Sequence, residues 1–365
     1  MNAAMVRRLG PAILVGLPIV IISWVMLHFS GGSWWPSDLV LVRNGIRQFW
    51  GTGDIQLTLG NNGNFYAPPW LVLLSWVGSL PATTAVGVVQ WLSVILLVAV
   101  IVGWGRREDG TVPWVTLGLG GSVSAISLVA FGQFGTAIGL AALAGALLSA
   151  RKGDWLIVGI MLGIGSIRLA NLIPIAVVLL IWAAKTTGWR ALGRIVFGAG
   201  MVLIPATVVV SLIDPSWPAE YLAALKTYPA YGVFRPIVQL GLSGNAFLLV
   251  CSTSWCMYLL RRGLSLDRCA AALLVTALFA PLGSTYALVF GLPALARLGL
   301  KPAGTLLPFL VALPWMCLGV CTLLGRPSGP PLLAAGECAV LMALVVLLHP
   351  PTRVPAPTKV IPLEA

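Results

Sequence analysis

The chain is poor in charge, and poorest in acidic side chains and histidine. Only 9% of its 365 residues are charged, and it holds ten acids and two histidines. A soluble enzyme of this length would carry far more surface charge. The sequence also lacks a Walker loop, a dinucleotide-binding glycine fingerprint and paired histidine ligands. These absences exclude the common soluble nucleotide and metal enzymes.

Cysteine usage implies neither a disulfide framework nor a metal centre. All six cysteines lie in or beside apolar runs, and the two histidines, His28 and His349, fall near opposite predicted membrane faces. A CxxxC pair without a nearby histidine or acid is a weak zinc signal. We interpret the cysteines as small buried hydrophobes and predict no cofactor, with a divalent metal requirement left open.

Long apolar runs dominate what remains. Hydrophobic residues make up 59% of the chain, and they form continuous runs instead of the alternation of a membrane barrel. Lipid as solvent requires such runs and forces the backbone into helices. The composition therefore predicts an all-α polytopic membrane protein.

The basic residues recur at the ends of apolar runs. The net charge of +12 comes from 22 cations, 16 of which fall on one side of the predicted topology and six on the other. This is the positive-inside pattern of a multi-pass protein, and it argues against nucleic acid as a partner. It predicts a cell-membrane protein with both termini in the cytoplasm.

The apolar runs predict about 12 transmembrane helices. They cover approximately 11–29, 84–104, 112–131, 134–150, 155–166, 171–184, 193–212, 244–260, 269–281, 284–298, 303–323 and 332–348. The run 67–81 is short for a span, and counting it would reverse the charge rule, so we predict an interfacial or re-entrant helix there. Residues 1–348 form one integral membrane domain with outer loops at about 30–83 and 213–243. Residues 349–365 form a Pro-rich cytoplasmic tail.

Candidate site residues lie on the predicted outer face. Arg168 is a lone cation between two short apolar runs, and such a charge is costly unless it faces water, an anion or the headgroup region. In the first loop, LVLVRNGIRQFW favours a helix along the membrane surface, which Asp38 would open as an N-terminal acid. Asp54 lies in the Gly-rich turn GTGD of the same loop.

The order of these motifs resembles a known group of enzymes. An aspartate soon after the first span, an aromatic-rich loop, NFYAPPWLVLLSWVGSLP, and then FGQFGTAIGLAALAGALLSARKGDWLIVGIMLGIGSIRLANLIP are similar to the GT-C superfamily of polyprenol-phosphate-sugar-dependent glycosyltransferases. The likeness is greatest to glycosyltransferase family 87 and covers roughly residues 11–185. Arg168 stands where the family usually has lysine, and Pro174 comes later than the family's proline.

The resemblance implies an inverting hexosyltransferase on the extracytoplasmic side. Its partners would be a polyprenyl-phosphate sugar donor, with mannose as the expected sugar, a glycolipid or glycan acceptor, and the lipid bilayer. Asp38 would act as general base, and Arg168, with Lys226 or Arg235, would hold the donor phosphate. The substrate-cavity candidates are Asp54, Tyr66, Gln133, Asn171 and Tyr286.

Two other classes stay open. A transporter or flippase of lipid-linked substrates would also show about twelve crossings and broken helices. It would place ionisable residues in mid-span, whereas the acids here lie mostly in loops, with Glu337 as the exception. A non-catalytic scaffold or inactive relative would need no acid in the outer loop.

Overall fold

The computed structural model describes residues 3–29, 37–54, 66–227, 240, 242–279 and 285–348. Within these ranges every regular element is a helix. Arg235 and the Pro-rich tail, 349–365, lie outside the described residues. The predicted class, an all-helical polytopic membrane protein, is confirmed at this level.

Seven helical runs among the described residues are long and apolar enough to cross a membrane. They are Ala82–Gly105 (α6), Phe134–Lys152 (α9), Trp155–Thr186 (α10 and α11), Trp189–Ile213 (α12), Ser243–Leu260 (within α14), Pro302–Leu323 (α17 with the turn before it) and Gly329–Leu348 (α18). The first helix, α1 (Ala3–Phe29), carries a shorter apolar stretch over Leu9–Val25. Exposed Leu, Val, Phe and Trp side chains along α12 and α17 provide a surface suited to lipid.

The 32-residue run 155–186 is a hairpin and not one helix. It consists of α10 (Trp155–Gly165), a 3-10 turn η2 (Ser166–Arg168) and α11 (Leu169–Thr186). Straight, it would extend about 48 Å. Instead, Trp155 Nε1 at its start donates a hydrogen bond of 3.1 Å to Thr187 Oγ1 just past its end. The turn at Arg168 therefore lies at the opposite end of the hairpin, as the sequence predicts.

Besides 155–166, whose helix α10 has only 11 residues, three of the expected crossings do not form continuous spanning helices. The run 112–131 is broken into α7 (Trp114–Leu117), η1 (Gly118–Gly121) and α8 (Val123–Ala130), and 284–298 into η5 (Thr285–Gly291) and α16 (Leu292–Leu298). The run 269–281 gives α15 (Leu266–Leu278), of 13 residues. Each piece is shorter than the roughly 20 residues that a spanning helix needs. Glycines interrupt the first run, and neighbouring helices bury the others.

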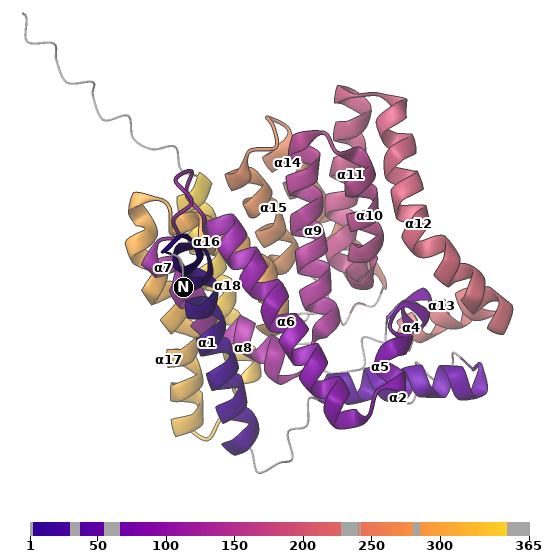
Figure 1. Ribbon diagram of the computed structural model, residues 1–365, viewed down its shortest axis with the longest axis horizontal. Coiled ribbons are helices and arrows are strands. Elements are labelled where there is room, and N and C mark those ends of the chain that lie inside the picture. The colour runs from indigo at the N-terminus through magenta and orange to yellow at the C-terminus, as the bar shows by residue number, and fades with distance from the viewer. Residues whose placement is uncertain are drawn as a thin grey trace, which may run out of the picture.

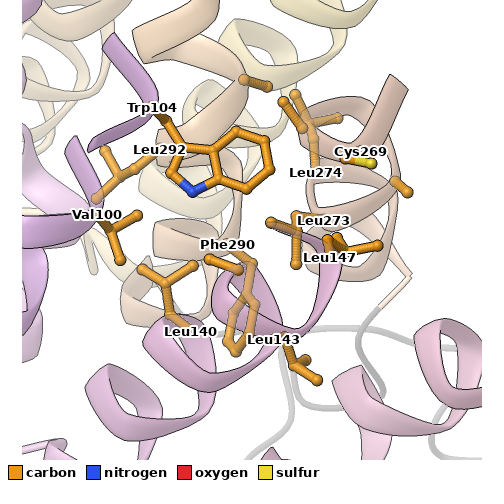
Figure 2. Packing of buried hydrophobic residues seen from close by; sticks show 14 of the residues in the cluster. Val100, Trp104, Leu140, Leu143, Leu147, Cys269, Leu273, Leu274, Phe290 and Leu292 are labelled. Carbon is orange, nitrogen blue, oxygen red and sulfur yellow. The ribbon is translucent and has the colours of Figure 1, made fainter. Parts of the chain in front are cut away.

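These short helices form the centre of the bundle. Figure 2 shows Trp104 of α6 packing beside Leu147 of α9, Leu273 of α15 and Phe290 of η5, which are all almost fully buried. The main core cluster draws on the same four elements together with α16 and α18. Broken helices at membrane depth are tolerated when protein surrounds them.

Several short helices lie across one end of the bundle (Figure 1). They are α2 (Ser37–Thr52), α4 (Pro69–Leu73), α5 (Ser75–Ser79) and α13 (Trp217–Thr227). The expected single helix over 67–81 is split into α4 and α5 at Leu74. A second apolar cluster, which includes Phe49, Trp70 and Phe134, attaches these helices to the bundle. This end of the bundle carries the candidate site.

Candidate functional site

The first turn of α2 meets the start of α9. Asp38 lies in the first turn of α2, and Gln133 directly precedes Phe134, where α9 begins. Gln133 Nε2 donates a hydrogen bond to Asp38 Oδ2. The positive ends of two helices therefore converge near this carboxylate, a position that favours negative charge.

Arg168 reaches the same glutamine from the α10–α11 turn. Its Nη2 donates to Gln133 Oε1 and to Thr136 Oγ1, and Thr136 Oγ1 donates to Gln133 Oε1 at 3.3 Å. We call these four residues, Asp38, Gln133, Thr136 and Arg168, the amide-bridged cluster. Because Arg168 can only donate, it fixes the orientation of the Gln133 amide and directs the amide N–H towards Asp38.

Two aromatic rings flank the guanidinium group of Arg168. Its Cζ lies 5.8 Å from the centroid of Tyr66 and 6.0 Å from that of Tyr286. Burial raises the pKa of Tyr66, although the charge of Arg168 acts in the opposite direction. The phenol is therefore neutral at physiological pH.

Two glycines of α9 make room for these side chains. A Cβ at Gly135 would collide with the Tyr66 hydroxyl, and one at Gly139 would lie 2.9 Å from Arg168 Cγ. Nearby, Trp70 Nε1 donates to Ser166 Oγ at 3.0 Å, and that hydroxyl donates to Gly163 O at 2.7 Å. The small residues and the Trp70–Ser166 bond hold Tyr66 and Trp70 close to the Arg168 turn.

The cluster contains a buried donor without an acceptor. Among the described residues, Arg168 Nε is buried and has no hydrogen-bond partner. Leaving such a group unpaired costs about 1–3 kcal/mol, and more when it is charged. The arrangement keeps a carboxylate and a guanidinium apart by one amide, and it leaves the cation with an unused donor. It is chemically suited to an anion at Arg168 beside a proton acceptor at Asp38.

The other predicted site residues are not brought into this cluster. Asn171 is buried, but its Nδ2 donates to Thr276 O of α15 at 3.1 Å. Asp54 follows the far end of α2, about 24 Å along a 16-residue helix from Asp38. Lys226 lies in α13, where the backbone alone is described, and Arg235 lies outside the described residues. Their roles stay predictions.

Sequence reasoning missed Thr136, Trp70 and the function of the two glycines. One signal was present, because Thr136 follows Gln133 by three residues and Gly139 follows by six, which places all three near one helix face. Trp70 lies in the run 67–81, for which the sequence predicts only an interfacial or re-entrant helix. Its partner Ser166 is 96 residues away, a contact that no local pattern reveals.

Within the described ranges, no three His, Cys, Asp or Glu side chains gather in a way that could hold a metal ion. Comparison of the chain with protein-family models, curated proteins and solved structures finds no match. The class that the fold and site define is therefore an all-helical membrane protein with a carboxylate–amide–guanidinium cluster at one end of the bundle.

Proposed function

We propose that the protein is a membrane glycosyltransferase that moves a sugar, mannose as the first choice, from a polyprenyl-phosphate donor to a glycolipid or glycan acceptor on the extracytoplasmic side. The observation that carries the proposal is the amide-bridged cluster. In this cluster Asp38 and Arg168 hydrogen-bond to the two ends of the Gln133 amide. The proposal gives Asp38 the role of proton acceptor and Arg168 that of anion-binding group, and transfer needs both.

Asp38 takes the part of the general base in this reaction. The acceptor hydroxyl oxygen attacks the anomeric carbon and gives its proton to the Asp38 carboxylate. The bond between that carbon and the phosphate oxygen breaks, and the polyprenyl phosphate leaves with the bonding electrons. A single displacement inverts the anomeric configuration and requires no covalent enzyme intermediate.

Arg168 takes the part of the phosphate ligand. Its buried, unpartnered Nε supports this assignment, because a phosphate oxygen would satisfy that donor. Stabilising the charge that develops on the departing phosphate lowers the barrier to transfer. Tyr66 and Tyr286 enclose the guanidinium and limit water around it.

The location of the cluster fits a lipid-borne donor. It lies at the end of the bundle where α2, α4 and α5 lie across the ends of the long apolar helices (Figure 1). A sugar carried on a polyprenyl chain arrives in the membrane plane, so it reaches such a site without leaving the bilayer. A nucleotide sugar, which is confined to the cytoplasm, would not reach the predicted outer face.

A direct assay tests the proposal. The purified chain is incubated with radiolabelled polyprenyl-phosphate mannose and a membrane lipid extract, and lipid products are separated. Transfer of label to a second lipid or glycan supports the function. If neither transfer nor hydrolysis of the donor occurs, while labelled donor still binds, the inactive-relative alternative is preferred. A second experiment checks the orientation of the chain in the membrane. A cysteine introduced next to Asp38 should react with a labelling reagent added to the outside of intact cells.

A further inference from the structure

A cavity of about 190 Å³ lies between α2 and the start of α6. It is lined by Leu39, Val40, Arg43, Ala82, Ala85 and Val86. All of these except Arg43 are apolar. Water gains little in such a space because a buried water needs two to four polar partners, whereas a hydrocarbon chain fits its lining.

Arg43 is the one charged residue among the described residues that line this cavity. Its Nε and Nη2 both donate to Leu80 O, at 3.2 and 2.9 Å, in the turn between α5 and α6. A guanidinium has five N–H bonds, so three remain for another acceptor in this part of the described chain. The contact with Leu80 thus fixes the side chain while leaving donors available.

A second cation lies one helical turn further along α2. Arg47 is exposed, and its Cγ lies 3.6 Å from the point that a Cβ on Gly78 of α5 would occupy. Arg43 therefore contacts the turn before α6, and Arg47 lies beside α5 one helical turn away. The nearest acid on α2 is Asp38, which is engaged by Gln133. This part of α2 therefore offers two positive charges beside the apolar cavity.

The position relative to the membrane decides the kind of ligand. The apolar helix α6 begins at Ala82, which lines the cavity, so the cavity lies where a spanning helix enters the bilayer. At that depth a lipid presents its phosphate beside its first methylene groups. An anionic lipid matches both the cations and the apolar space.

We propose that an anionic phospholipid binds between α2 and α6, with part of one acyl chain in the cavity and its phosphate against Arg43 and Arg47. The bound lipid holds α2 against the bundle. Leu39 lines the cavity and the adjacent Asp38 belongs to the amide-bridged cluster, so the lipid sets the position of that helix. This inference is independent of the proposed transferase activity, whose phosphate site is Arg168.

Thermal unfolding of the purified, delipidated full chain tests the site. Phosphatidylglycerol added to neutral detergent micelles should raise the Tm by about 3 °C more than the same mole fraction of phosphatidylcholine. The double variant Arg43→Gln, Arg47→Gln should lose this difference, and so should Ala82→Leu, which fills the cavity. Arg326→Gln, at an exposed cation in the turn between α17 and α18, is the matched control and should keep it.

Native mass spectrometry of the unmodified chain gives a result that does not depend on any variant folding. The protein should retain phosphatidylglycerol in preference to phosphatidylcholine after gentle activation. Equal stabilisation by the two lipids, or an unchanged response in Ala82→Leu, would overturn the proposal. Displacement of phosphatidylglycerol by polyprenyl phosphate alone would also overturn it, because the cavity would then belong to the sugar donor.

Discussion

Two charged groups lie at opposite ends of the bundle and are built differently. In the amide-bridged cluster, the Gln133 amide separates Asp38 from Arg168. At the other end, where α15 begins, Asp267 is paired directly with Arg297 at 2.7 Å and Lys301 at 2.6 Å. These direct ion pairs use both oxygens of the Asp267 carboxylate to stabilise the fold. Under the proposed function, separation by the amide lets Asp38 serve as the proton acceptor and Arg168 as the phosphate ligand.

The two charged groups also differ in how fully their polar atoms are hydrogen-bonded. Burial alone would raise the pKa of Asp267, but hydrogen bonds from Lys301 and Arg297 hold it below its ordinary value. Both carboxylate oxygens of Asp267 accept a hydrogen bond. The amide-bridged cluster instead retains a buried guanidinium N–H without a partner in the described structure. An unmet donor of this kind points to a ligand, whereas a satisfied ion pair points to structure.

The largest expected effect comes from removing the proton acceptor. Asp38→Asn keeps the size of the side chain, and turnover should fall by on the order of 10²- to 10⁴-fold with little change in Tm. Transfer of labelled sugar at saturating donor measures this. Asp54→Asn is the control at the other end of α2 and should cost much less. Full activity in Asp38→Asn would remove the distinction between the two charged groups.

Removing the cation should act on donor binding. Arg168→Gln should weaken the affinity for polyprenyl-phosphate mannose by about 10- to 100-fold, because charged hydrogen bonds to phosphate are lost. Arg168→Lys retains the charge without the planar fork and should recover part of that loss. Competition binding with unlabelled polyprenyl phosphate measures both. Unchanged affinity in a folded Arg168→Gln protein would assign this arginine to the headgroup region.

Converting the bridging amide should change the pH dependence. Gln133→Glu places a carboxylate beside Asp38 and removes the N–H that stabilises it, so the acid limb of the transfer rate should move to higher pH, with turnover reduced by about tenfold. Gln133→Met removes the N–H without adding charge and should cause a smaller shift. Rate profiles from pH 4 to 9 distinguish these cases. Identical profiles in both variants would mean that Gln133 only supports the fold.

The smallest effect on chemistry should come from the direct ion pairs. Asp267→Asn should lower the Tm by about 2–4 °C and leave the transfer rate unchanged. Because the folded pKa of Asp267 lies below the ordinary value of 3.8, its stabilisation is fully present above that pH. It is lost as the pH falls through the lower folded value. Thermal unfolding between pH 3 and 7 should therefore show a Tm difference between the wild-type and variant chains that is largest near neutral pH and decreases as the pH falls below 3.8. Loss of transfer in Asp267→Asn at neutral pH would contradict the assignment of this group to structure.

Local pattern was enough for several elements of the fold. Apolar runs located α6, α9 and α12 to within a few residues, and the acid at Asp38 correctly marked the first turn of α2. Pattern failed for the run 112–131, which is broken at Gly118–Gly121. Hydropathy measures how apolar a segment is, and a buried broken helix is as apolar as a spanning one. The number of crossings therefore did not follow from the runs.

The sequence by itself determined the helical membrane class and the candidate residues, because the bilayer demands long apolar helices and makes each isolated charge conspicuous. Only the tertiary structure decided which candidates meet. Asp38, Gln133 and Arg168 come from three separate segments, and their contact depends on the hairpin at Arg168 and the path of α2 across the bundle. Asn171 and Asp54 are equally suitable candidates in sequence, but Asn171 donates to Thr276 O of α15 and Asp54 follows the opposite end of α2. Long-range packing sets those positions, and no local preference encodes it.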